Sequence, residues 1–101
     1  MINTLSSMLV LGAGAWGSAF ASRISNGHPK ANIHLWARNA DHVAKLKSNS
    51  FNEKYLAGIK LSDKLVFGSD LNETVKYWVK VNENADGLKI LVLAIPVSGI
   101  L

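Results

Sequence analysis

Residues 8–17 read Met-Leu-Val-Leu-Gly-Ala-Gly-Ala-Trp-Gly. This apolar run leads directly into Gly12-x-Gly14-x-x-Gly17, and a stretch compatible with a helix follows. In such a context Gly12 allows a tight turn off a strand, Gly14 lets a pyrophosphate approach the backbone, and Gly17 lets the helix pack closely on the sheet. The pattern therefore predicts a dinucleotide-binding turn. The alternative is an ordinary turn between a strand and a helix that binds nothing.

The composition is that of one globular domain. The chain has 101 residues, of which 49% are hydrophobic and 18% charged, so a packed core is expected rather than a disordered segment. The net charge is +4, but the eleven Lys and Arg residues are scattered singly, and we expect no nucleic-acid binding. Cysteine is absent, which excludes disulfides and thiolate chemistry from this chain. The three histidines are not at metal-ligand spacing, so no metal site is expected.

The N-terminus and the apolar runs predict neither a signal peptide nor a membrane span. The first residues carry no basic region followed by a long apolar core, which argues against a signal peptide. The longest apolar run, Ile90–Val97, is much shorter than the ~20 residues of a membrane helix. A cytoplasmic protein is therefore the default expectation.

Apolar periodicity predicts strands alternating with helices. The expected strands are Met8–Leu11, Asn32–Ala37, Leu65–Phe67 and Lys89–Ile95, and the expected helices are Ala15–Asn26, Ala40–Ser48 and one that begins near Asp70. Right-handed crossovers arrange such a chain as a parallel sheet with strand order 3-2-1-4. The fold class is therefore α/β, a doubly wound Rossmann-type sheet. It is incomplete, because one mononucleotide half and a single strand of the second are present.

Local signals place the ends of the helices. Asn39 and Asp70 are expected as N-caps, and Gly27 as a left-handed C-cap. The near-continuous apolar run Lys89–Ile95 predicts a central strand covered on both faces. Since its outer edge would then be unpaired, we expect the chain to be the N-terminal part of a longer dinucleotide-binding domain.

Three large side chains are expected to have structural roles. Trp36 and Trp78 fall on apolar faces and are expected in the core, and His34 is expected to be a packed or hydrogen-bonded strand residue. Trp16 leaves two possibilities open: it walls the cofactor, or it covers the start of the helix.

The end of the second strand lacks the acidic residue that usually holds the ribose of NAD. The sequence there is Trp36-Ala-Arg-Asn39, with no carboxylate. Arg38 is placed to meet a 2′-phosphate or to stack on the adenine, which predicts use of NADP or of both cofactors. The alternative is a surface arginine without a ligand.

These pieces resemble the NAD(P)-dependent glycerol-3-phosphate dehydrogenases of the bacterial type. The matching stretches are Gly12-Ala-Gly-Ala-Trp-Gly17, His34-Leu-Trp-Ala-Arg-Asn39, Asn52-Glu-Lys-Tyr-Leu-Ala-Gly-Ile59 and Ile90-Leu-Val-Leu-Ala-Ile-Pro-Val97. They cover nearly the whole chain but only the first part of the family's length. Two positions depart from the family. The family often has Ser at the position of Ala15, and it usually has Pro at the position of Ala57.

The resemblance implies an enzyme that interconverts sn-glycerol 3-phosphate and dihydroxyacetone phosphate with NADP or NAD in glycerophospholipid synthesis. In the family, amides of the glycine turn cradle the pyrophosphate, and the end of the second strand holds the adenosine. The cofactor-binding residues implied in this way are Gly12, Gly14, Ala15, Trp16, Gly17, Arg38, Asn39, Tyr55 and Pro96. The family's catalytic lysines match no position in this chain, so we expect no catalytic residue here and an inactive fragment. The remainder of the nucleotide domain and a helical C-terminal substrate domain would lie beyond it, in a possible homodimer.

Two other functions share this half-domain. One is a different hydroxyacid or sugar-phosphate dehydrogenase, against which the segment Tyr55–Ile59 argues. The other is a non-catalytic nucleotide-sensing module. Such modules commonly keep an acid at the end of the second strand, and Arg38 argues against that reading.

Overall fold

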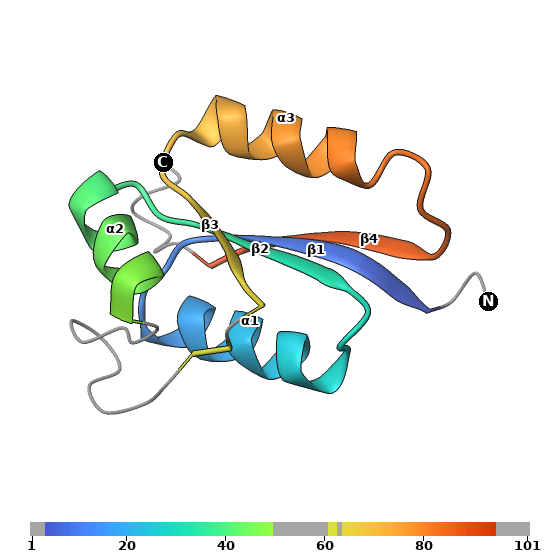
Figure 1. The fold of residues 1–101 in the computed structure, drawn as a ribbon, viewed down its shortest axis with the longest axis horizontal. Coiled ribbons are helices and arrows are strands. Elements are labelled where there is room, and N and C mark those ends of the chain that lie inside the picture. Colours follow the sequence, from blue (N-terminus) through green and yellow to red (C-terminus); the bar gives the residue numbers. More distant parts are fainter. Residues whose placement is uncertain (1–3, 50–60, 63, 95–101) are drawn as a thin grey trace.

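The fold is a parallel α/β sheet, seen in a computed structural model that describes residues 4–49, 61–62 and 64–94 (Figure 1). The elements are β1 (Leu5–Leu11), α1 (Ala15–Gly27), β2 (Asn32–Trp36), α2 (Ala40–Asn49), β3 (Val66–Gly68), α3 (Leu71–Val81) and β4 (Leu88–Leu93). All strand pairs are parallel, and the order of the four strands is β3-β2-β1-β4. The predicted fold class and strand order are thereby confirmed.

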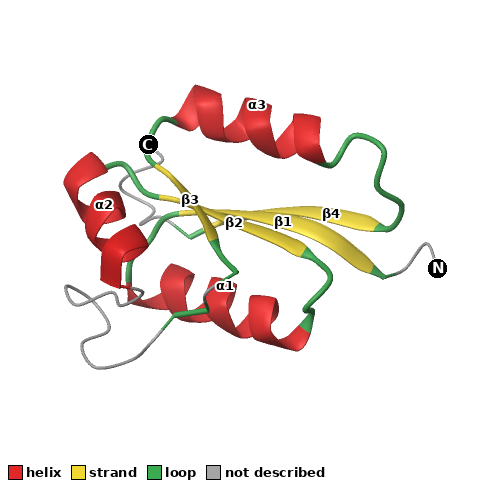
Figure 2. Cartoon of the chain, in the orientation of Figure 1, coloured by secondary structure: helices red, strands yellow, loops and turns green. Residues whose placement is uncertain are grey.

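Helices cover both faces of the sheet. Helix α1 lies on one face and α3 on the opposite face (Figure 2). Because successive strand residues point to opposite faces, β1 and β2 each supply one set of side chains to the α1 layer. The apolar core forms there, where strand residues such as Val10 and Leu35 join Ala21 of α1 and Leu46 of α2. The helices therefore bury the strands that carry the predicted glycine turn.

The layer under α3 contains buried polar side chains that lack a partner. Its strand residues include Ser7, Leu9 and His34, and the buried Leu9 pairs in register with His34. Four side-chain polar atoms among the described residues are buried without a hydrogen-bond partner, and they are Ser7 Oγ, His34 Nε2, Trp36 Nε1 and Trp78 Nε1. His34 also meets the ring of Tyr77 edge-on, with centroids 5.8 Å apart. The α3 face thus buries polar atoms without a partner, whereas polar groups buried under α1, such as the hydroxyls of Ser25 and Ser62, bond one another.

The helix caps follow the expectations in two of three cases. The side-chain oxygens of Asn39 and Asp70 accept hydrogen bonds from the backbone N–H groups of His42 and Glu73, at 3.0 and 2.9 Å. The left-handed cap at Gly27 is wrong, because the described glycines with positive φ are Gly12 and Gly87.

Helix α1 instead ends on His28, with φ −133° and ψ 72°. Pro29 follows this residue, and a proline disfavours helical backbone at the position before it. The proline therefore ends the helix without a left-handed glycine.

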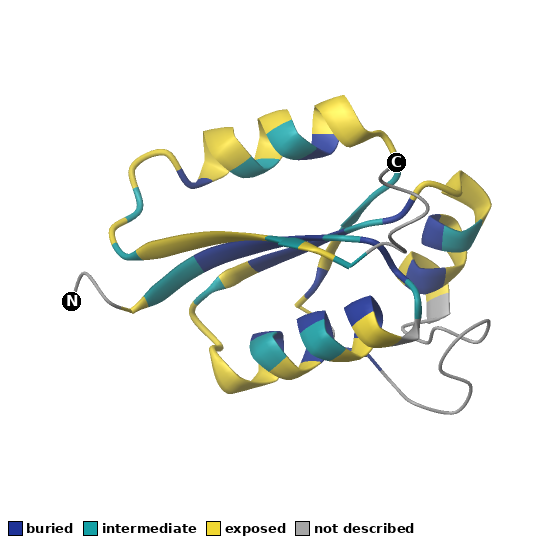
Figure 3. Ribbon diagram, turned by 180° about the vertical axis from the view of Figure 1, so that it is seen from behind, coloured by how far each residue is buried: buried dark blue, intermediate teal, exposed yellow. Residues whose placement is uncertain are grey.

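Strand β4 does not have the expected cover on both faces. It pairs with β1 along one edge, and Leu88, Ile90, Leu91 and Leu93 are all exposed, Leu93 to 57%. Figure 3 shows β4 and most of α3 as exposed, while the central strands are buried. The run is apolar, but the described helices lie mainly over its neighbours. Trp36 and Trp78, expected in the core, are half-buried.

His34 predicts a pH dependence of stability. Burial lowers the pKa of His34 below its ordinary value of 6.5, because the folded chain disfavours the charged imidazole. The unfolded chain therefore binds the proton more readily, and this site's contribution to stability is complete above pH 6.5 and declines as the pH falls toward the folded pKa. We expect His34→Phe, which keeps a ring against Tyr77, to reduce the loss of unfolding free energy between pH about 8 and about 5 in urea titrations. The exposed His28→Phe serves as control, and an equal loss in wild type and His34→Phe would contradict the assignment.

Candidate functional site

The glycine turn joins β1 to α1 at the carboxyl edge of the sheet. Gly12 has φ 122°, in the left-handed region that residues with a side chain rarely adopt. Its N–H donates a hydrogen bond of 2.8 Å to the carbonyl oxygen of Trp36, at the end of β2. The tight turn predicted at Gly12 is present, and it is tied to the neighbouring strand.

Gly17 permits the closest approach of α1 to the sheet. A Cβ added there would overlap the carbonyl oxygen of Gly12 and would lie 3.2 Å from the Cβ of Ala94. A side chain at this position would therefore push the first turn of α1 away from the ends of β1 and β4. This is the packing role that the sequence predicts for the third glycine.

No described neighbour requires a glycine at position 14. The φ of Gly14 is −71°, and a Cβ added to it would meet no atom of the described residues within 4 Å. Helix α1 begins immediately after it, at Ala15, with no side-chain cap and no acidic residue in its first turn. The first amides of a helix favour an anion when no side chain takes them. Open space beside Gly14, at such a helix start, fits the approach of a pyrophosphate.

Two side chains converge on the carbonyl oxygen of Ala13, inside the turn. The hydroxyl of the buried Ser18 donates a hydrogen bond to it at 3.1 Å, and Nε2 of His42 lies 3.5 Å from it. Neither Ser18 nor His42 was among the residues predicted for the site. A serine directly after the third glycine is a local signal for Ser18, whereas the contact of His42 spans 29 positions and has no local signal.

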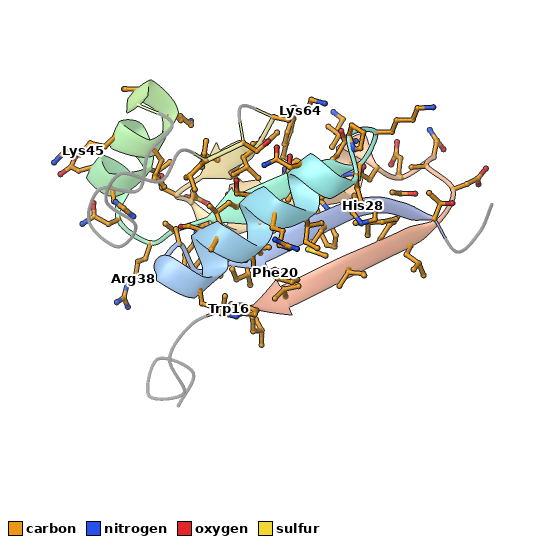
Figure 4. The ribbon with its side chains drawn as sticks, turned by 90° about the horizontal axis from the view of Figure 1, so that it is seen from below. Trp16, Phe20, His28, Arg38, Lys45 and Lys64 are labelled. Carbon is orange, nitrogen blue, oxygen red and sulfur yellow. The ribbon has the colours of Figure 1, made fainter. Side chains whose placement is uncertain are left out.

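The end of β2 forms the second side of the site. Arg38 is exposed, and its side chain points outward at the same end of α1 as Trp16 (Figure 4). Asn39 uses its side-chain oxygen to cap α2, which fixes the orientation of its amide group. The structure thus brings Arg38 and Asn39 to the same edge as the glycine turn.

Trp16 stacks on Phe20, one helical turn away. The two ring centroids are 4.9 Å apart and the planes differ by 6°, and Trp16 remains 60% exposed. The ring therefore packs along α1 and keeps much of its surface exposed. Two other predicted residues, Tyr55 and Pro96, lie outside the described residues, as does Ile95.

A row of serines on α1 holds a distant segment of the chain. The backbone N–H of Ser62 donates to Ser22 Oγ at 2.8 Å, and the hydroxyls of Ser25 and Ser62 are 2.9 Å apart. The adjacent Leu61 is buried in the core. These contacts, which the sequence analysis did not predict, secure the chain directly after residues 50–60 against the helix of the site.

The described residues hold neither a metal-ligand cluster nor a membrane-spanning helix. Among them, no cluster of three His, Asp or Glu side chains is arranged to hold a metal ion. No helix in the described ranges has the length and apolar character needed to cross a membrane.

A family profile matches residues 7–100 of the chain, and its description is NAD-dependent glycerol-3-phosphate dehydrogenase N-terminus. A curated relative from Geobacillus thermodenitrificans, named glycerol-3-phosphate dehydrogenase (NAD(P)+), is 34% identical over 97 residues, which are 95% of this chain and 24% of the relative. A relative of the same name from Cupriavidus pinatubonensis is 38% identical over 90 residues, 89% of this chain and 24% of the relative. The chain thus spans about a quarter of the length of the curated relatives it matches.

Solved structures agree with the sequence matches. Glycerol-3-phosphate dehydrogenase from Saccharomyces cerevisiae superimposes with a TM-score of 0.69 at 26% identity, over 93% of this chain and 27% of that one. The enzyme of the same name from Coxiella burnetii gives a TM-score of 0.60 at 27% identity, over 72% of this chain and 22% of that one.

Alanine substitutions at Gly17 and Gly14 should differ in their effect on the free energy of unfolding. Gly17→Ala places a methyl group against the carbonyl oxygen of Gly12, and we expect it to lower the unfolding free energy by about 3 kcal/mol. Gly14→Ala meets open space at an ordinary φ and should change that free energy by less than about 1 kcal/mol. Urea unfolding followed by circular dichroism measures both, and equal stabilities of the two variants would show that the close approach at Gly17 is not required.

Proposed function

The chain belongs to the family of NAD-dependent glycerol-3-phosphate dehydrogenases, which it matches over their N-terminus, and we propose that it forms the cofactor-binding part of such an enzyme. The reaction would interconvert sn-glycerol 3-phosphate and dihydroxyacetone phosphate, a step that supplies glycerophospholipid synthesis. The nicotinamide cofactor supplies the hydride chemistry, and the protein binds and orients it. The observation that carries the proposal is the open space beside Gly14 at the uncapped start of α1.

In this proposal the backbone of the glycine turn binds the pyrophosphate. The tight turn at Gly12 and the close packing at Gly17 hold the start of α1 against the sheet, and the amides from Gly14 to Trp16 face the phosphates. Trp16 is exposed beside this start, so its ring is available to line the cofactor. Tyr55 and Pro96 complete the list on the strength of the family resemblance.

Arg38 and Asn39 bind the adenosine end. The residues that follow β2 include no carboxylate to hold a ribose 2′-hydroxyl. An exposed guanidinium at this edge suits a 2′-phosphate, because arginine matches phosphate with several N–H groups at once. We therefore propose NADP as a cofactor, with NAD also accepted.

The remaining properties of the proposed enzyme are supported by the family membership. Catalytic groups and the site for the substrate phosphate would belong to the three quarters of the family's length that this chain does not span. A cytoplasmic location and assembly as a homodimer belong to the same proposal, supported by the resemblance alone.

Binding of the cofactor is the first test. We expect NADPH to shift the amide resonances of residues in the glycine turn in ¹⁵N-¹H spectra of the chain. Gly14→Ala should weaken binding about tenfold or more, because its methyl group fills the space where the phosphate approaches the backbone. Gly27→Ala is the matched control, since its Cβ also meets open space but at the other end of α1. Absence of any NADPH-dependent shift in the wild-type chain would refute the proposed cofactor site.

A chimera can test whether this chain supports turnover and which cofactor it prefers. Residues 7–100 would replace the matching segment of the Geobacillus thermodenitrificans relative, and oxidation of NADPH and NADH by dihydroxyacetone phosphate would be followed. We expect turnover, and Arg38→Ala should lower kcat/KM for NADPH about tenfold with little effect on NADH, because it removes a charged hydrogen-bond donor to the 2′-phosphate.

Arg23→Ala, an exposed arginine on α1, is the control for loss of charge. A chimera that binds NADPH but does not turn over dihydroxyacetone phosphate would disprove that this chain can act as the cofactor-binding part of such an enzyme. An unchanged ratio of the two cofactors in Arg38→Ala would disprove the role of that residue.

A further inference from the structure

We propose that His42 is a positioning residue that aims the backbone of the glycine turn at the cofactor's diphosphate and couples the turn to the adenosine end of the site. The inference rests on the proposed cofactor-binding function and adds to it a residue from a different helix. It starts from the carbonyl oxygen of Ala13, on which Ser18 Oγ and His42 Nε2 converge.

The carbonyl of Ala13 controls where the next amide points. A peptide unit is planar and trans, so the C=O of Ala13 and the N–H of Gly14 point in opposite directions. Side chains that hold the Ala13 oxygen toward the protein therefore turn the Gly14 N–H the other way. Ala13 is 6% exposed, whereas the space beside Gly14 is open. Holding the carbonyl thus presents the Gly14 amide to the place proposed for the diphosphate.

His42 contributes what Ser18 cannot. Ser18 belongs to α1 and moves with the turn, whereas His42 lies in α2, which begins directly after Arg38 and Asn39. The backbone N–H of His42 donates to Asn39 Oδ1 at 3.0 Å. A single residue therefore contacts both the cap of α2, beside the proposed adenosine site, and the carbonyl within the glycine turn.

The distance leaves room for adjustment on binding. Nε2 of His42 is 3.5 Å from the Ala13 oxygen, longer than the 2.7–3.2 Å of an ordinary hydrogen bond. With the proton on Nε2, a shift of a few tenths of an ångström would close the bond. A ligand that draws Arg38 and the start of α2 toward its adenosine end would thereby also fix the Gly14 amide for its diphosphate.

Two substitutions separate positioning from packing. His42→Gln keeps an N–H donor of similar reach, and His42→Leu fills similar space without a donor. We expect His42→Leu to weaken NADPH binding threefold to tenfold by calorimetry, the equivalent of one hydrogen bond, and His42→Gln to restore most of that loss. Lys45→Gln, an exposed change on α2, is the control and should bind as wild type. Equal affinities of wild type and His42→Leu, or a His42→Gln variant no better than His42→Leu, would overturn the proposal.

Coupling between the two ends provides a second readout. If His42 transmits the position of α2, the effects of Arg38→Ala and His42→Leu on NADPH affinity should not be additive, and the double variant should lose less than the product of the two losses. Additive losses would reject the coupling while leaving the cofactor site intact.

A measurement without ligand distinguishes failure of this inference from failure of the proposed function. In the free chain, His42→Leu should move the carbonyl carbon resonance of Ala13 and the amide resonance of Gly14, and His42→Gln should move them less. If wild type binds no NADPH but these shifts appear, the cofactor proposal fails and the positioning contact stands. Unchanged Ala13 and Gly14 resonances in His42→Leu would refute the positioning contact itself.

Discussion

The site depends on one close approach, that of the first turn of α1 to the carbonyl oxygen of Gly12. Only a hydrogen atom at Gly17 fits between them. This contact sets how closely the helix lies on the sheet, and it brings the start of α1 to the ends of β1 and β4. The left-handed Gly12 before it and the open Gly14 within the turn have their effect because the helix is held there. Cofactor binding is thus proposed where Gly14 leaves space beside the backbone at the start of α1.

Much of the fold was predictable from local sequence, because its determinants act over a few residues. The apolar run before Gly12 identifies the central strand, and the handedness of crossovers then orders the other strands. Asn39 and Asp70 were predicted as caps since such residues accept the first helix amides. The left-handed cap predicted at Gly27 is wrong, because Pro29 disfavours helical backbone at His28, and His28 is the C-cap. The exposure of β4 was missed because an apolar run does not reveal which neighbours cover it.

Some features of the candidate site were likewise predictable from local sequence, and others were not. The glycine spacing and the arginine after β2 are visible in the sequence, since each lies within one strand-to-helix connection. The contact from His42 to Ala13 joins two such connections, and it exists only because β1 and β2 are neighbours in the sheet. Asn39 shows a related effect: its side chain is engaged in capping α2, so its part in the site is to orient the start of that helix as well as to meet a ligand.

The two faces of the sheet differ in the free-energy cost of exposing them to water. Under α1 and α2 the core is mainly apolar and its buried serines are hydrogen-bonded, so exposing this layer to water is unfavourable. Under α3, polar atoms without partners are buried in Ser7, His34, Trp36 and Trp78. When the helix separates from the sheet, hydration of those atoms would offset part of the free energy lost with the helix–sheet contacts. Helix α3 is therefore suited to open as a separate unit, with the glycine turn and its core remaining closed. Its amides would exchange with solvent through such partial openings, whereas those of β1 would exchange when the whole domain unfolds.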